Sequence, residues 1–195
     1  MVAPYMKRDN DIADLDYYPT PAWATRALLK YVPSVSGATC LEPACGAGHM
    51  SRALLEVFPE VRSYDIADRG YGKLANFLTD DFSPVDWVIT NPPYNVALDF
   101  VKKSLLLSST GVAMFLRSTF AESAGRYEEL FRDTPPTTIA QFVERVGLVK
   151  NGVVSKANAC VPYAWFVWDK RQGGRTDFVW LPPCKKALER PEDYS

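Results

Sequence analysis

The sequence is poor in the residues that bind metals and form disulfides. Its 195 residues include a single histidine, His49, and four cysteines, none of them in a Cys-x-x-Cys pair. A zinc site would need ligands scattered along the chain, and the spacing does not resemble a disulfide framework. We therefore expect no metal site and a reduced, cytoplasmic protein.

Charge and hydropathy exclude further classes of protein. The formal net charge is −1 and the pI is about 5.9, which argues against a protein that coats nucleic acid through a broad basic surface. No apolar run approaches the roughly 18 residues of a membrane span, and residues 1–16 lack the apolar core of a signal peptide. What remains suits one globular domain, which we place at residues 17–195 behind a flexible polar arm at 1–16.

Apolar runs alternate with segments of helical spacing along most of the chain. The predicted strands are 38–42, 61–66, 75–82 (a short extended piece), 85–90, 111–117, 138–149, 161–169 and 178–181. The predicted helices are 22–31, 49–58, 97–108 and 127–132. This alternation predicts an α/β fold, with a parallel sheet covered by helices on both faces. The ligand site of such a sheet lies beyond the carboxyl ends of its strands.

A glycine turn follows the first predicted strand. Gly46-Ala47-Gly48 opens the next predicted helix, and its glycines allow backbone N–H groups to approach a ligand closely. Ser51 stands where the dinucleotide fingerprint has its third glycine, which favours a smaller ligand. Asp65 ends the second predicted strand, 19 residues after Gly46, a spacing that suits a carboxylate binding both hydroxyls of a ribose. The alternative for Asp65 is an ordinary turn residue.

The tetrapeptide Asn91-Pro92-Pro93-Tyr94 (NPPY) ends the apolar run at 85–90. The two prolines stop the strand and contribute no N–H donor. The turn therefore presents acceptors, namely the Asn91 side-chain oxygen and the carbonyl groups of Asn91 and Pro92, beside an aromatic ring. This combination suits a planar amino group, such as that of adenine, cytosine or a carboxamide. A stiff turn with a packed tyrosine is the alternative interpretation.

Taken together and in this order, the glycine turn, Asp65, the Asp80-Asp81-Phe82 segment and NPPY resemble the class I S-adenosylmethionine-dependent methyltransferases. NPPY in particular is similar to the amino-methyltransferases that modify exocyclic amines of adenine or cytosine in DNA. The resemblance covers about residues 16–170, and the short chain resembles stand-alone enzymes of phages and prophages. It implies a Rossmann-like fold with a mostly parallel seven-stranded sheet, S-adenosylmethionine as cofactor, and direct methyl transfer without a metal.

The resemblance also implies which residues bind the cofactor. They are Tyr18, Thr20 and Pro21 at the methionine end; Glu42, Cys45, Gly46 and Gly48 around the methionine moiety; Asp65 at the ribose; Ile66, Asp81 and Phe82 at the adenine ring; and Asn91. Asp80 is the alternative to Asp81.

The residues implied to be catalytic are Asn91, Pro92, Pro93 and Tyr94. The Asn91 side chain and the Pro92 carbonyl would accept the two hydrogens of the target amine and direct its nitrogen lone pair at the methyl group. Tyr94 would stack on the target ring, so a base in a duplex would have to be flipped out.

Residues implied to contact the substrate lie further along the chain. Trp165 or Phe166 would pack against the target base, with an ordinary core strand as the alternative. Arg117, Arg126, Lys150 and Lys156 are candidate phosphate contacts. We expect no separate target-recognition domain in a chain of this length.

We therefore expect methyl transfer to the 6-amino group of adenine in DNA, by a protein that acts alone, as a homodimer or with a partner subunit. The alternatives are the same chemistry on DNA cytosine, on RNA adenine or on a protein glutamine, and a non-catalytic, cofactor-binding partner subunit.

Overall fold

The computed structural model describes residues 17–148 and 161–194. The arm expected at 1–16 and the candidate phosphate contacts Lys150 and Lys156 lie outside the described residues. Within the described ranges, no helix is both long and apolar enough to cross a membrane.

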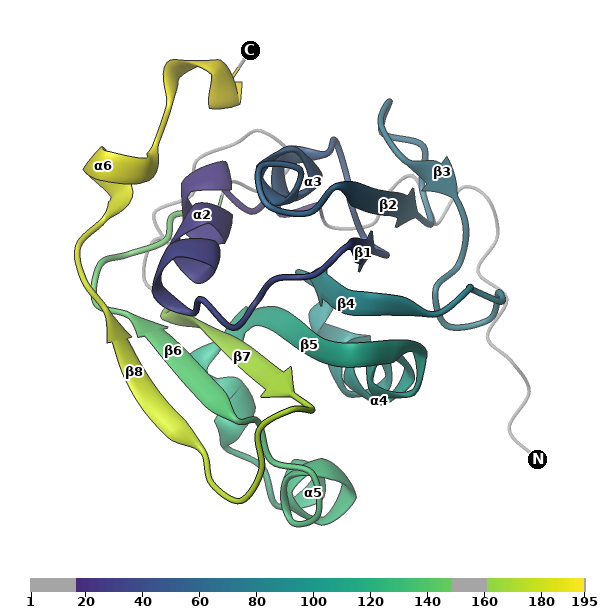
Figure 1. Ribbon diagram of the computed structural model, residues 1–195, viewed down its shortest axis with the longest axis vertical. Coiled ribbons are helices and arrows are strands. Elements are labelled where there is room, and N and C mark those ends of the chain that lie inside the picture. Colours follow the sequence, from purple (N-terminus) through teal and green to yellow (C-terminus); the bar gives the residue numbers. More distant parts are fainter. Residues whose placement is uncertain (1–16, 149–160, 195) are drawn as a thin grey trace.

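An eight-stranded sheet forms the centre of the molecule (Figure 1). Its strands are β1 (Thr39–Glu42), β2 (Glu60–Asp65), β3 (Lys73–Leu74), β4 (Val85–Thr90), β5 (Ser108–Arg117), β6 (Thr138–Phe142), β7 (Tyr163–Asp169) and β8 (Asp177–Leu181). Their order is β3-β2-β1-β4-β5-β7-β6-β8, and β7 alone runs antiparallel to its neighbours β5 and β6. The expected α/β fold with a mostly parallel sheet is confirmed, with β8 added beside β6 at one edge.

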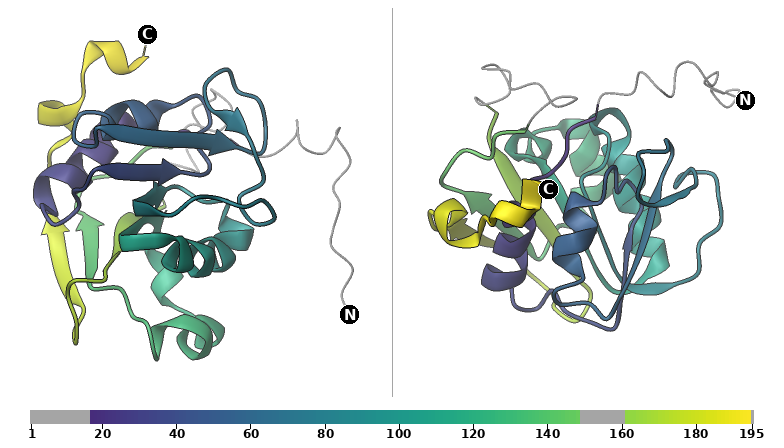
Figure 2. Two further views of the ribbon diagram at one scale, coloured as in Figure 1. Left: turned by 45° about the vertical axis from the view of Figure 1, so that its right-hand side comes forward. Right: turned by 90° about the horizontal axis from the view of Figure 1, so that it is seen from above.

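Helices cover both faces of this sheet (Figures 1 and 2). On one face lie α2 (Ala22–Tyr31) and α3 (His49–Leu54). On the other face lie α4 (Ala97–Leu107), η2 (Ser118–Ala121), α5 (Ala124–Arg126) and η3 (Tyr127–Phe131), the last a π-helical turn. Because side chains alternate along a strand, each central strand contributes to two cores. In β5, for example, Phe115 packs on the α2 side and Met114 on the α4 side.

Three predictions of secondary structure differ from the structure. The extended piece predicted at 75–82 is wrong, since only Lys73–Leu74 pairs with β2 and a turn follows. The turn forms because the Asn76 side chain accepts from Leu78 N–H and the Asp80 side chain accepts from Asn76 N–H. The strand predicted at 138–149 stops at Phe142, and the helix predicted at 49–58 stops at Leu54.

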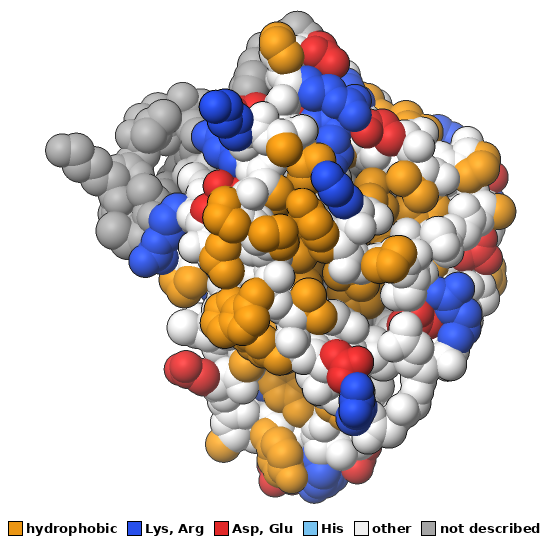
Figure 3. Space-filling view, turned by 60° about the vertical axis from the view of Figure 1, so that its left-hand side comes forward, with side chains coloured by type: hydrophobic (Ala, Val, Ile, Leu, Met, Phe, Trp, Pro, Cys, Tyr) orange, Lys and Arg blue, Asp and Glu red, His pale blue; other side chains and the backbone are white. Residues whose placement is uncertain are grey.

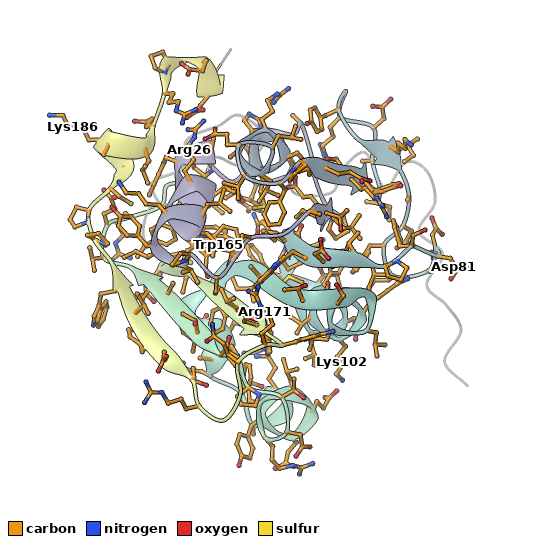
Figure 4. All side chains as sticks on the ribbon, in the orientation of Figure 1. Arg26, Asp81, Lys102, Trp165, Arg171 and Lys186 are labelled. Carbon is orange, nitrogen blue, oxygen red and sulfur yellow. The ribbon has the colours of Figure 1, made fainter. Side chains whose placement is uncertain are left out.

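The C-terminal segment is fastened to α2 and α3 by a buried arginine. It contains α6 (Lys185–Leu188) and η5 (Pro191–Tyr194). The Arg26 guanidinium donates to both carboxylate oxygens of Asp193 at 2.7 Å, to Glu56 at 2.8 Å and to the Leu188 carbonyl at 2.8 Å (Figure 4). Arg190 adds two hydrogen bonds to Glu56. This cluster ties the end of the described chain to α2 and to the turn that follows α3.

Hydrophobic side chains are exposed along the edge strand β8 (Figure 3). Phe178 and Trp180 are 53% and 65% exposed, and their rings are in edge-to-face contact at 4.9 Å. They point away from Val179 and Leu181, which pack on the α2 side.

The carboxyl ends of β1, β2, β3, β4 and β5 meet at one rim of the sheet, as expected for parallel strands. Because β7 is antiparallel, it begins at this rim, and its first residue, Tyr163, lies directly opposite Arg117 at the end of β5. Residues from both the parallel strands and the antiparallel strand therefore reach the same place.

Candidate functional site

The glycine turn between β1 and α3 adopts backbone angles that require glycine. Gly46 and Gly48 have φ of 54° and 82°, in the left-handed region. A Cβ on Gly46 would lie 2.2 Å from the Tyr17 ring, and one on Gly48 would lie 2.4 Å from the Tyr71 ring. The turn therefore forms a shallow cradle in which flat groups lie directly against the backbone.

Asp65 contacts this turn, as the sequence spacing suggests. One carboxylate oxygen accepts a hydrogen bond from Gly46 N–H at 2.8 Å, and the other accepts from Ala67 N–H at 2.9 Å. The next N–H of the turn, that of Ala47, donates to the Tyr17 hydroxyl at 2.9 Å. Ile66, which follows Asp65, is 40% exposed at the same rim.

Glu42 lies beneath the turn as a buried carboxyl group. Its side chain accepts a hydrogen bond from the Ser51 hydroxyl, which is itself 2.7 Å from the Ser63 hydroxyl. Burial, with a smaller contribution from the nearby charge of Asp65, raises the pKa of Glu42 to about 8. Ser51 thus has a role that a third glycine could not fill, and its partner Ser63 was not singled out from the sequence.

The Asn91 amide is held at one end and unpaired at the other. Its Nδ2 donates to the Tyr18 carbonyl at 3.1 Å, which fixes the amide plane. Its Oδ1 is buried and has no hydrogen-bond partner among the residues that the structure describes. Leaving a buried acceptor unpaired destabilises a fold by about 1–3 kcal/mol, so such an atom calls for an explanation. The Thr20 hydroxyl, on the segment that leads into α2, is buried and unpaired in the same sense.

The rest of the NPPY turn presents the Tyr94 ring. Pro92 is buried, Pro93 is exposed, and Tyr94 begins the short helix η1 (Tyr94–Val96) before α4. The Tyr94 ring lies 6.0 Å from the Tyr18 ring at 43°, so the segment before α2 and the NPPY turn are brought together. Burial, together with a hydrogen bond to another tyrosine hydroxyl, raises the pKa of Tyr94 well above its usual range.

Asp81 and Phe82 do not join this group. They line a groove beside α4 together with Asp99, Lys102 and Lys103, and Asp81 lies at the outer end of the molecule in Figure 4. After β3 the chain continues at the rim through Ala75, which donates to the Asp65 carbonyl at 2.9 Å, to Asn76.

Trp165 and Phe166 are completely buried, which favours the alternative of an ordinary core strand. Trp165 donates from Nε1 to the Ala24 carbonyl at 3.0 Å, between α2 and the sheet (Figure 4). Phe166 points to the opposite face, where it packs edge-to-face on Phe120. Alternation along a strand places neighbouring side chains on opposite faces, so the aromatic run serves two cores. Tyr163, at the rim, is the residue of this strand that reaches Tyr94.

The candidate phosphate contacts also differ from one another. The Arg126 guanidinium donates to the backbone carbonyls of Thr119, Phe120 and Glu122 and so serves the local fold. Arg117 is exposed at the rim, with its guanidinium 4.3 Å from the centre of the Tyr94 ring. Within the described residues, no three His, Cys, Asp or Glu side chains are grouped so that they could hold a metal ion.

Comparison with solved structures identifies the class of fold. A modification subunit of a provisionally assigned type I restriction enzyme from Vibrio vulnificus YJ016 matches with a TM-score of 0.60 at 16% identity, over 95% of this chain and 52% of that chain. A provisionally assigned RNA methyltransferase from Pyrococcus horikoshii matches with a TM-score of 0.61 at 17% identity, over 84% of this chain and 98% of that chain. A dimethyladenosine transferase from Plasmodium falciparum matches with a TM-score of 0.54 at 17% identity, over 78% of this chain and 62% of that chain.

The chain therefore has the Rossmann-like fold of class I methyltransferases. It spans about half the length of the modification subunit that it matches. No protein-family model matches the sequence. A search of curated proteins likewise found no match.

Proposed function

We propose that this protein transfers a methyl group from S-adenosylmethionine to an exocyclic amine, with the 6-amino group of adenine in DNA as the favoured acceptor. The observation that carries the proposal is the unpaired, buried Oδ1 of Asn91, held in a fixed plane beside an aromatic ring at the end of β4. A planar amino group supplies the hydrogen that this oxygen lacks, and its ring would lie against Tyr94.

The residues around the glycine turn fit the proposed cofactor. The glycines of the turn let flat rings, those of Tyr17 and Tyr71, lie against the backbone. Asp65 lies next to the turn, and each of its carboxylate oxygens accepts one backbone N–H and retains a lone pair for a ribose hydroxyl. Glu42 is a buried carboxyl group that would pair with the ammonium group of the methionine moiety. Bound here, S-adenosylmethionine would supply an activated methyl group.

At the adenine end of the cofactor we assign Asn76 in place of Asp81. Asn76 lies two residues after the end of β3, and β3 pairs with the end of β2 at Asp65. The residue between them, Ala75, donates its N–H to the Asp65 carbonyl. Its side-chain carbonyl accepts one hydrogen bond from Leu78 N–H and retains a second lone pair for an amino group. Ile66, half exposed beside Asp65, would cover the adenine ring.

The chain itself contributes to the reaction by positioning and by hydrogen bonding. Asn91 Oδ1 and the Pro92 carbonyl would accept the two amine hydrogens, which withdraws the nitrogen lone pair from the ring and leaves it free to react. The Asn91 amide needs no reorientation, because the Tyr18 carbonyl already holds its Nδ2. Tyr94 would hold the ring in plane with these acceptors.

Nucleic acid is the favoured source of the amine. Three neighbours in fold carry names that refer to modification by a restriction enzyme, to RNA methylation and to dimethyladenosine. The exposed Arg117 offers a cation at the mouth of the site, although the net charge of −1 indicates modest affinity.

The test is a transfer assay with methyl-labelled S-adenosylmethionine and, in turn, duplex DNA, single-stranded DNA, RNA and total cell protein. The proposal predicts label in DNA that digests to methylated adenine. Label confined to RNA, protein or cytosine would assign the same chemistry to another acceptor. Cofactor binding without transfer to any of them would indicate a partner subunit.

Asn91→Ala should reduce transfer at least 100-fold while leaving cofactor affinity within about a few-fold, because it removes an acceptor that acts on the amine. The matched control is Asn95→Ala, an exposed asparagine in the same turn, which should transfer at the parent rate. Equal rates for Asn91→Ala and the parent would refute the mechanism.

A further inference from the structure

We propose that Tyr163 and Arg117 are positioning residues that together hold the Tyr94 ring in the orientation in which it receives the acceptor. The inference rests on the proposed role of Tyr94 as the surface on which the acceptor ring stacks. We call the two residues the Tyr94 clamp.

Tyr163 fixes the hydroxyl end of Tyr94. The two hydroxyl oxygens are 2.9 Å apart, within hydrogen-bond distance. Tyr163 is itself held by packing, because its side chain is buried and its ring stacks on Phe115 with 5.0 Å between centroids and 7° between planes. The hydrogen bond therefore anchors Tyr94 to the core of the sheet and not to another surface group.

Arg117 fixes the face of the Tyr94 ring. Its guanidinium lies 4.3 Å from the ring centre, which is the geometry of a cation–π contact. Arg117 and Tyr163 are paired residues of β5 and β7, so the sheet itself sets the distance between the two parts of the clamp. Tyr163 holds the hydroxyl end of the Tyr94 ring, and Arg117 covers one of its faces.

The remaining described contacts of the Tyr94 ring are apolar and do not involve its hydroxyl group. The ring packs on the α2-side core and is tilted against the Tyr18 ring at 6.0 Å, while the neighbouring Pro93 and Asn95 are exposed. A phenyl ring stacks on a base without needing a hydroxyl group. The Tyr94 hydroxyl, buried against Tyr163, is therefore explained by orientation of the ring.

The first test measures the motion of the Tyr94 ring directly and needs no acceptor. We would place 3-fluorotyrosine at position 94 and follow it by ¹⁹F NMR in the parent, in Tyr163→Phe and in Arg117→Met. A clamped ring should give two resonances in slow exchange, and each variant should bring them toward a single averaged line. The matched controls are Tyr127→Phe, at an exposed site, and Arg62→Met, at a half-buried site on β2 that is paired with Glu60 and not with Tyr94; both should leave the parent spectrum unchanged.

The second test reads function in the transfer assay, with duplex DNA as the probe. Losing one hydrogen bond should lower kcat/KM of Tyr163→Phe about three- to tenfold, with cofactor affinity by calorimetry within twofold of the parent. Tyr94→Phe removes the same bond, so the double variant should be no worse than either single variant. Arg117→Lys, which keeps the charge but not the planar group, should lie between the parent and Arg117→Met.

The outcomes separate the two proposals. Unchanged ¹⁹F spectra in both Tyr163→Phe and Arg117→Met would overturn the clamp, whatever the acceptor proves to be. Additive losses in the double variant would also overturn it, since they would mean that the two hydroxyls act separately. A parent protein that methylates none of the acceptors would refute the proposed function, while the NMR result would still decide the clamp.

Discussion

Glu42 offers the sharpest link between the candidate site and the stability of the fold. Its carboxyl group is 2% exposed, has a serine hydroxyl as its side-chain partner, and has a pKa raised by burial from 4.5 to about 8. We expect Glu42→Gln, which preserves shape and removes the ionisation, to stabilise the protein at high pH.

The sign follows from linkage between protons and folding. The carboxyl group binds its proton more tightly in the folded state, so its contribution to stability is fully present below about pH 4.5 and is lost as the pH rises toward 8. Each pKa unit corresponds to about 1.4 kcal/mol, so the loss amounts to about 5 kcal/mol above pH 8. Glu42→Gln should escape this loss.

Urea unfolding at pH 5 and pH 9 measures the effect for the parent, for Glu42→Gln and for the exposed control Glu122→Gln. We expect Glu42→Gln to have a free energy of unfolding several kcal/mol above that of the parent at pH 9, and to differ little from it at pH 5. The control should follow the parent at both values. A Glu42→Gln protein less stable than the parent at pH 9 would refute the assignment of a strained, buried carboxylate.

Three further predictions concern the surroundings of the site. Arg26→Met should lower the free energy of unfolding by about 3 kcal/mol near pH 7, measured in urea, because it removes the guanidinium that pairs with the buried carboxylate of Asp193. A change below about 1 kcal/mol would contradict this. Asn76→Ala should weaken cofactor binding at least fivefold by calorimetry, while Asp81→Ala should leave it unchanged. Weaker binding in Asp81→Ala, with Asn76→Ala unchanged, would instead support Asp81 as the residue that binds the adenine end of the cofactor. Tyr17→Phe should tighten cofactor binding severalfold, because its hydroxyl occupies an N–H of the glycine turn; weaker binding would make Tyr17 a cofactor ligand.

The fold was largely predictable because its signals are local. The apolar run at 85–90 and the helical spacing at 22–31 match β4 and α2 residue for residue. The failure at 75–82 is also local in origin: Asn76 and Asp80 bond to nearby N–H groups and make a turn of a segment whose apolar residues suggest a strand.

The sequence predicted the site residues that lie at the ends of parallel strands. It did not predict those whose position depends on packing between segments far apart in the chain. Asp65 and the glycine turn meet because parallel strands end at one rim. Tyr163 reaches the rim beside Tyr94 only because β7 is antiparallel, which no spacing in the sequence reveals. The burial of Trp165 depends on α2, which is 141 residues away in the chain at Ala24.

The pairing of β6 and β7 has a consequence for how this fold can be extended. The two strands are antiparallel neighbours, so the chain leaves the sheet after Phe142 and returns at Tyr163 on the same side of it. A longer connection here would leave every strand pairing intact, and doubling its length would add only about 0.6 kcal/mol of closure entropy. Sequence inserted into the connection between these two strand ends would therefore emerge beside Tyr94. Such an insertion would change which acceptors reach the Tyr94 ring.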